Sequence, residues 1–228
     1  MKVDIYGACD KAIKAMNREN LEAFGRLKGV KWDEVHVIRT VAAVYAESNR
    51  RARKRYYEVG FEAYLLGMML CDIDPQEAHR RAEGTITEKW VDVILSEVDP
   101  VAKYRFDAET ERKAYRLAEA LEVARNRNRE IDSALRSWSQ QLGQFAINIT
   151  DYALMEAYLD AGVEEVEWVS AGDQRVCGDC HSYDGKYFTS MMCRQSRISD
   201  VGALSSRRAK VISYGRKPFE IVAEKRRK

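Results

Sequence analysis

The chain of 228 residues is long enough to bury a substantial hydrophobic core, in one domain or in two small ones. Hydrophobic residues make up 46% and charged residues 32%, which is ordinary for a folded soluble protein. The first residues hold no apolar run of signal-peptide length and the chain has no apolar stretch of about 18 residues, which disfavours secretion by that route and membrane spanning.

Helical periodicity dominates the first 162 residues. Apolar spacing predicts a helix over 3–27 and, after Trp32, a long helix to about Leu70. The predicted apolar face of the first helix consists of Ile5, Ala8, Ala12, Ile13, Met16 and Leu21, and that of the second begins at Val35. Because the chain has only three prolines, long helices can run without interruption.

A cluster of cations lies in the middle of the long predicted helix: Arg50, Arg51, Arg53, Lys54 and Arg55. We expect most of such a run to face solvent. The alternative is a contact with nucleic acid or with an acidic protein surface.

Two further helices follow. Asp74 before Pro75 is typical of a helix start, and that helix should end before Asp99-Pro100. Asp107 is expected to cap the next helix, over about 108–126.

The strongest periodic signal comes next, with apolar residues at alternating spacings of four and three. These residues are Ile131, Leu135, Trp138, Leu142, Phe145, Ile149 and Tyr152. A repeat of about 3.5 residues predicts a helix that packs lengthwise against another helix. Gly162 supplies the left-handed stop of this helix.

After Gly162 the pattern changes from helical to extended. Alternating apolar and polar residues predict a strand within 163–170, and a second short strand is expected at 185–188. The predicted fold class is therefore mainly α: a long-helix bundle with a small C-terminal β-hairpin that bears a C-x-x-C motif, and a basic extended tail. The expected divisions are 1–162 for the helical body, 163–193 for the hairpin module and 194–228 for the tail.

The five cysteines fall into two groups. Cys9 and Cys71 lie in apolar helical context, where a thiol behaves as a small buried hydrophobe. The other group suggests a metal site, whose candidate ligands are Cys177, Cys180, His181 and Cys193.

Three chemistries compete for the C-x-x-C-H motif, and a metal-free hairpin is the alternative to all of them. Haem attachment is disfavoured by the missing export signal and the charged surroundings, and a thioredoxin-like pair by the strand that follows the motif in place of a helix. Zinc is the better fit, because two thiolates at this spacing can take two corners of a tetrahedron.

The segment as a whole resembles the Mu F-like minor head proteins of tailed phages. The resemblance rests on Trp168, then Asp173 and Arg175 before the C-x-x-C motif, and Asp184-Gly185-Lys186 and Phe188 after it. The family's closing motif is represented only by Met192-Cys193-Arg194. The resemblance implies a minor capsid component, made in the host cytoplasm, that joins portal and capsid proteins inside the phage head and takes part in head assembly and in DNA packaging or delivery.

Charge is unevenly distributed along the chain. The net charge is +2, but residues 194–228 carry +8 and the preceding residues −6. Such a tail predicts an anionic partner, packaged DNA or an acidic surface, through Arg194, Arg207, Arg208, Lys210, Arg226 and Arg227.

A structural role is therefore favoured over catalysis. The three histidines, His36, His79 and His181, lie in different predicted elements with no motif linking them. The alternative function is a small zinc-containing nucleic-acid-binding protein. An oxidoreductase that uses Cys177 and Cys180 is the least favoured hypothesis.

Overall fold

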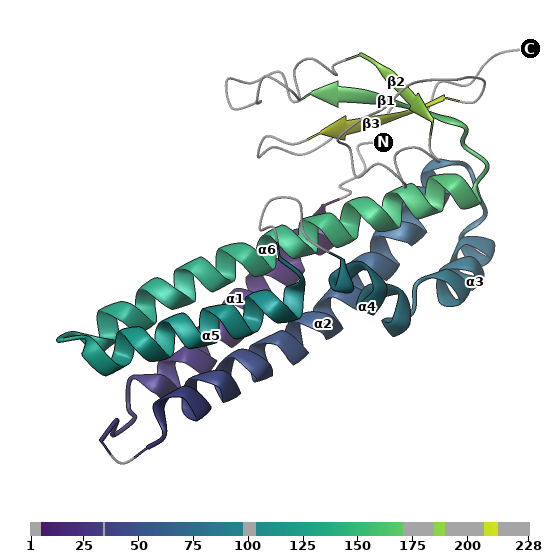
Figure 1. The fold of residues 1–228 in the computed structure, drawn as a ribbon. Helices are drawn as coiled ribbons and strands as arrows, with labels where there is room; N and C mark the ends of the chain where they lie inside the picture. The colour runs from purple at the N-terminus through teal and green to yellow at the C-terminus, as the bar shows by residue number, and fades with distance from the viewer. Residues whose placement is uncertain (1–5, 34, 98–103, 171–184, 190–207, 214–228) are drawn as a thin grey trace, which may run out of the picture. The chain divides into compact units, whose positions relative to one another are not determined.

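The computed structural model describes residues 6–33, 35–97, 104–170, 185–189 and 208–213, with the backbone alone in 166–170, 188–189 and 208–213. Its helices are α1 (Gly7–Leu27), α2 (Val37–Leu70), α3 (Pro75–Thr85), α4 (Glu88–Ser96), α5 (Phe106–Val123) and α6 (Arg127–Asp160). Its strands are β1 (Glu165–Ser170), β2 (Tyr187–Thr189) and β3 (Arg208–Ser213). The predicted mainly α class is confirmed (Figure 1). Among the described helices, none combines the length and apolarity needed to cross a membrane.

The chain divides into two compact units. The bundle unit comprises 9–59 and 86–149, and the second unit comprises 1–8, 60–85 and 150–228. Both 34-residue helices, α2 and α6, contribute residues to each unit. The predicted boundaries at 162 and 193 both fall within the second unit and stay predictions.

The core of the bundle unit is built around Trp138 of α6. In this unit α1, α2, α5 and α6 lie lengthwise beside one another (Figure 1). The Trp138 ring, fully buried, meets Tyr45 of α2 edge-on at 5.4 Å between centroids and stacks on Phe106 of α5 at 5.9 Å. Phe24 of α1 packs edge-on against Tyr45 at 5.0 Å, so all four helices reach one aromatic cluster.

The 3.5-residue repeat of α6 is confirmed as a buried seam. Ile131, Trp138, Leu142, Phe145 and Ile149 are each at most 5% exposed, whereas Leu135 and Tyr152 are half-buried. The repeat therefore marks the side of α6 that faces the other helices, as its spacing predicts.

A buried polar chain crosses this apolar core. The indole Nε1–H of Trp138 donates to Ser48 Oγ at 2.8 Å, and Ser48 Oγ donates to Asn20 Oδ1 at 2.5 Å. Since unpaired polar atoms are costly in a core, these bonds favour one register of α1, α2 and α6 over sliding alternatives.

The second unit contains the C-terminal part of α2, α3 and the C-terminal part of α6, and two small residues meet where α2 contacts α6. A β-carbon at Gly67 of α2 would lie 2.7 Å from the Ala157 Cβ of α6, so the two helix backbones approach closely there. Tyr64 of α2 donates to an Asp160 carboxylate oxygen at 2.5 Å, which links the same two helices at the end of α6.

The predicted end of α6 is confirmed. Gly162 has φ 74°, the left-handed conformation that glycine adopts without strain. The Val163 N–H bonds to the Tyr158 carbonyl at 2.9 Å and closes the helix.

The single helix expected from Pro75 to before Asp99 is wrong, because the chain forms two helices, α3 and α4. Gly84 and the β-branched Thr85, Ile86 and Thr87 favour helix poorly. Thr87 instead becomes an N-cap, whose side-chain oxygen accepts from the Trp90 N–H at 3.1 Å.

The capping role predicted for Asp107 is also wrong. Helix α5 begins two residues earlier than expected, at Phe106, and its N-cap residue Arg105 makes no side-chain capping bond. The Asp107 carboxylate instead accepts from Asn49 at 3.0 Å and from Arg53 at 2.7 Å, both on α2.

Two apolar residues assigned to buried faces are exposed. Leu21 of α1 is 60% exposed, and Val35, which precedes the start of α2, is 38% exposed. Buried Asn20 holds the inward position beside Leu21, because it joins the polar chain with Ser48.

The described strands pair in the order β2-β1-β3. Strand β1 is antiparallel to β2, with Val166 opposite Phe188, and parallel to β3, with Trp168 opposite Val211. Residues 171–184, which carry the C-x-x-C motif, lie outside the described residues, so the predicted hairpin module stays a prediction.

Candidate functional site

The predicted metal site lies outside the part of the chain that the structure describes. This holds for all four candidate ligands, Cys177, Cys180, His181 and Cys193. Among the described residues, no group of three or more His, Cys, Asp or Glu side chains is arranged to hold a metal ion. Zinc at the cysteine motif therefore stays a prediction.

The family-motif residues are divided between described and undescribed segments. Trp168 lies in β1, where the structure describes its backbone alone. Gly185, with φ 73°, lies two residues before β2. A β-carbon at Gly185 would meet nothing within 4 Å, so its backbone conformation, and not crowding, is what favours glycine there. Asp173, Arg175 and Asp184 lie outside the described residues.

Two of the predicted anion-binding residues of the tail belong to a strand. In β3, Arg208 lies opposite Glu165 and Lys210 opposite Glu167 of β1. The other predicted tail contacts, Arg194, Arg207, Arg226 and Arg227, lie outside the described residues.

The two cysteines assigned to helices are buried to different extents. Cys9 is 1% exposed, as expected for a small hydrophobe in the core. Cys71 is half-buried, and burial, with Asp72 nearby, raises its thiol pKa to about 11. A thiol with that pKa is protonated at neutral pH and is a poor nucleophile.

In the arginine run of α2, Arg50 and Lys54 are exposed, and the side chains of Arg51, Arg53 and Arg55 are 37%, 29% and 33% exposed. Arg51 bonds to Glu47 at 2.5 Å, within the same helix. Arg53 and Arg55 form ion pairs with acids of other helices.

Arg53 is the most connected of these side chains. Its guanidinium donates to both oxygens of Asp107, at 2.7 and 2.9 Å, and also bonds to Asp92 of α4. It lies over the Phe106 ring at 5.6 Å from the centroid. Burial opposes ionisation of Asp107, but the bonds from Arg53 and Asn49 outweigh it and hold its pKa below the usual value.

Arg55 joins α2 to α1. It donates to Glu19 of α1 at 2.7 Å and to Glu58 of its own helix at 2.9 Å. The hydrogen bonds to Glu19 and Glu58 raise the pKa of Arg55. Arg53 and Arg55 therefore act within the bundle unit as structural cross-links.

The remaining cations of this helix share one exposed face. Between residues 37 and 59, the exposed residues of α2 are Arg39, Ala43, Ala46, Arg50 and Lys54, at spacings of four, three, four and four. This spacing places them on one side of the helix. We call this row the cationic face of α2. Arg39, Arg50 and Lys54 form no ion pair with any residue that the structure describes.

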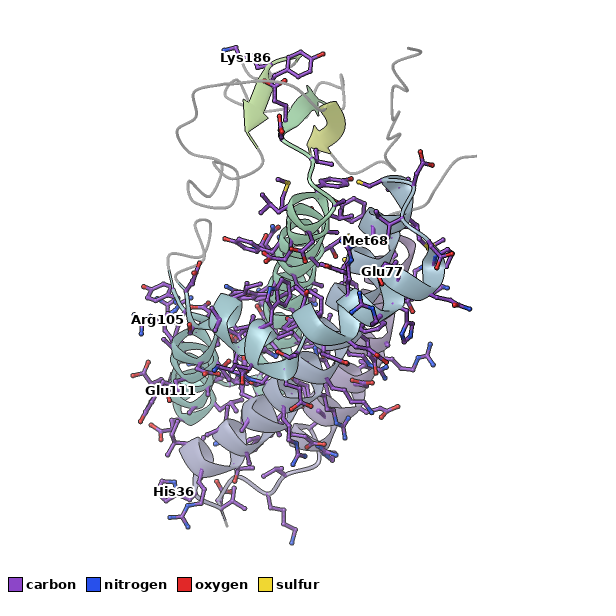
Figure 2. All side chains as sticks on the ribbon, turned by 90° about the vertical axis from the view of Figure 1, so that its right-hand side faces the viewer. His36, Met68, Glu77, Arg105, Glu111 and Lys186 are labelled. Atoms are coloured by element: carbon purple, nitrogen blue, oxygen red, sulfur yellow. The ribbon has the colours of Figure 1, made fainter. Side chains whose placement is uncertain are left out.

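The bundle unit has other charged residues at its surface, but they are mixed. His36, directly before α2, is exposed and points away from the helices, and Glu111 of α5 also points outward (Figure 2). The exposed positions of α5 include Glu111, Arg116 and Glu119, charges of both signs. The cationic face of α2 differs in carrying one sign of charge.

The second unit contains an ionisable group that sequence reasoning missed. Asp151 of α6 is half-buried and accepts a hydrogen bond from the Tyr6 hydroxyl at 2.5 Å. Burial raises the pKa of Asp151 to about 7, although the bond from Tyr6 acts in the opposite direction. The sequence feature that could have indicated this group is the position of Asp151 within the apolar stretch of α6, between Ile149 and Ala153.

Comparison of the chain with models of protein families, with curated proteins and with solved structures finds no match.

Proposed function

We propose that the chain is a minor structural protein of a tailed-phage head. In this proposal it is made in the host cytoplasm, binds portal and capsid proteins inside the head, and takes part in head assembly and in DNA packaging or delivery. The observation that carries the proposal is the joint motif that runs from Trp168 through Asp173, Arg175 and the C-x-x-C motif to Asp184-Gly185. This combination is far more specific than a single C-x-x-C pair.

The helical part of the chain supports a docking role. Four helices of the bundle unit meet at one aromatic cluster, and ion pairs through Arg53 and Arg55 cross-link α2 to its neighbours. A body held by such contacts presents fixed surfaces to a partner, which lowers the conformational entropy that binding must overcome.

The cysteine segment is the proposed recognition element. The antiparallel pairing of β1 with β2 supports this role, because it places Glu167 opposite Tyr187, on the strands that precede and follow this part of the sequence. Thiolates and an imidazole suit zinc, so Cys177 and Cys180 with Cys193 and His181 form the donor set for a structural zinc ion.

Co-purification with a portal protein tests the proposal. The full chain would carry an affinity tag and be co-expressed with a tailed-phage portal protein, taken from the same genome if the gene has a portal neighbour. We expect the wild-type chain to retain the portal, and the double variant C177S/C180S to lose it while keeping its helical circular-dichroism spectrum. The matched control is C71S, which removes a thiol from the helical part and should retain the portal.

Two results would reject the proposal. One is a wild-type chain that captures no portal protein and whose gene has no portal or terminase neighbours. The other is tight binding to one DNA sequence over random DNA together with stoichiometric zinc, which would favour the alternative function, a zinc-containing nucleic-acid-binding protein.

A further inference from the structure

We infer that the cationic face of α2 (Arg39, Ala43, Ala46, Arg50 and Lys54) binds the phosphate backbone of double-stranded DNA without reading its sequence. This inference does not depend on the proposed role in a phage head, because it rests only on charge and exposure within the bundle unit.

The first argument is that nearby ion pairs leave the three cations uncompensated. Arg51 and Arg26 share Glu47, Arg53 binds Asp92 and Asp107, and Arg55 binds Glu19 and Glu58. In this network four arginines meet five carboxylates, so its net charge is −1 and all but one of the acid charges are balanced within it. The acids near α2 are thus engaged by other arginines, and Arg39, Arg50 and Lys54 keep their positive charge for an external anion.

The second argument is the shape of the face. From Arg39 to Lys54 the row extends along the helix by about 22 Å at the α-helical rise. A DNA duplex carries one phosphate charge per about 1.7 Å of its axis, so a row of this length meets many phosphates. Ala43 and Ala46 lie between the cations, and because their side chains are short, they let the helix approach the DNA backbone closely.

The third argument distinguishes DNA from an acidic protein. Protein interfaces have a buried centre enriched in aromatic and other large apolar side chains. The cationic face of α2 has no side chain of this kind, since its only apolar members are two alanines. Guanidinium groups, in contrast, bind phosphate oxygens in a bidentate manner.

A matched control face lies on α1. Lys11, Lys14 and Arg18 are also exposed and form no ion pair with a described residue, but exposed Asp10 and Glu22 adjoin them. The same charge can therefore be removed from a cationic face and from a mixed one.

The experiment measures binding of the full chain to a random-sequence duplex by fluorescence anisotropy at several salt concentrations. The test variant is R39Q/R50Q/K54Q and the control variant is K11Q/K14Q/R18Q, and each removes three positive charges. We expect the test variant to lose about tenfold or more in affinity at low salt. We also expect its salt dependence, the slope of log K against log salt, to fall in magnitude by about 2 to 3. The control should change both quantities much less. The basic tail is unchanged in both variants and contributes equally to their DNA affinity.

Several outcomes would overturn the inference. Equal losses in the two variants would mean that only total charge matters, and an unchanged affinity of the test variant would mean that α2 does not touch DNA. A test variant that keeps DNA affinity but loses binding to a polyglutamate peptide would assign the face to an acidic protein. Thermal unfolding checks that both variants fold. Neither set of substitutions should change co-purification with the portal protein, so this inference and the proposed function can fail separately.

Discussion

The two units of the protein fill their interiors in different ways. In the bundle unit, large rings from four helices occupy the centre, and hydrogen bonds join Trp138 Nε1 to Ser48 Oγ and Ser48 Oγ to Asn20 Oδ1, although the Asn20 Nδ2 atom is buried without a partner. In the second unit, helix backbones approach closely at Gly67 and Ala157, and the hydroxyls of Tyr6 and Tyr64 donate to partly buried carboxylates. Large side chains thus set the helix spacing around Trp138. In the second unit, which also buries Tyr64 and Tyr158, the absence of a side chain at Gly67 lets α2 and α6 approach closely.

This difference implies opposite sensitivities to mutation. Removing volume should be most harmful where rings fill the core, because the surrounding helices relax only partly around a cavity. Adding volume should be most harmful where two backbones already touch. Four measurements test this difference between the two units.

The largest effect is expected for Trp138→Ala in the bundle unit. The substitution removes a fully buried ring and the donor to Ser48, so the free energy of unfolding should fall by about 3–5 kcal/mol. Urea denaturation measures this loss. The control is Tyr115→Ala on α5, where the ring is 61% exposed and the change should stay within about 0.5 kcal/mol. A loss below about 1 kcal/mol for Trp138→Ala would contradict the aromatic core.

The next effect concerns pH and the second unit. The Asp151 pKa rises from 3.8 to about 7 in the folded chain because of burial. Between these values the unfolded chain releases a proton that the folded chain keeps, so stability should fall as pH rises from about 4 to 7 and then level off. A shift of this size corresponds to at most about 4 kcal/mol.

Asp151→Asn isolates this contribution, because the amide oxygen can still accept from Tyr6 but cannot ionise. The stability difference between the variant and the wild type, measured by thermal unfolding from pH 4 to pH 8, should grow in favour of the variant as pH rises. A difference that is constant with pH would show that Asp151 ionises normally.

A smaller effect is expected for Gly67→Ala. The new methyl would meet Ala157 Cβ at 2.7 Å, so the helices must move apart at a cost of about 1–3 kcal/mol. The control is Gly84→Ala on α3, where a β-carbon would meet nothing within 4 Å and the higher helix propensity of alanine should add up to about 1 kcal/mol. In chemical denaturation we expect the free energy of unfolding to fall for Gly67→Ala and to rise for Gly84→Ala. Changes of the same sign would contradict the close approach of α2 and α6.

The smallest expected effect is the difference in stability loss between substitutions of two arginines of α2, Arg53 and Arg50. Arg53→Gln breaks the bonds to Asp92 and Asp107, and because these carboxylates are 59% and 68% exposed, the loss of stability should be only about 1 kcal/mol. Arg50→Gln removes an exposed cation that has no partner among the described residues and should change stability by less than about 0.5 kcal/mol. Equal losses in thermal unfolding would contradict the division of these residues into structural and free cations.

The helices of the first 162 residues could be predicted because their signals are local. The 3.5-residue repeat that includes Trp138 and Phe145 marks a buried side wherever the partner helices come from, and Gly162 stops a helix through its own backbone freedom. The break between α3 and α4 carried a local signal too, in Gly84 and Thr87, but the capping bond of Thr87 depends on a choice between two conformations that spacing alone does not make.

The candidate sites could be predicted less well, because their state depends on partners distant in sequence. Charge alone marked the arginine run in the sequence. Whether Arg53 is free to bind an external group, however, depends on Asp92 and Asp107, which come 39 and 54 residues after it. The cysteine motif lies outside the described residues, so its metal site stays a prediction from the spacing of the cysteines.

The mainly helical class and the buried side of α6 both follow from the period of the apolar residues along the chain. The bond from Arg53 to Asp107, the burial that raises the pKa of Asp151 and the exposed row of Arg39, Arg50 and Lys54 depend instead on how the helices pack. The physical reason is that desolvation and ion pairing depend on which groups surround a side chain in space, whereas helix formation depends mainly on its neighbours along the chain.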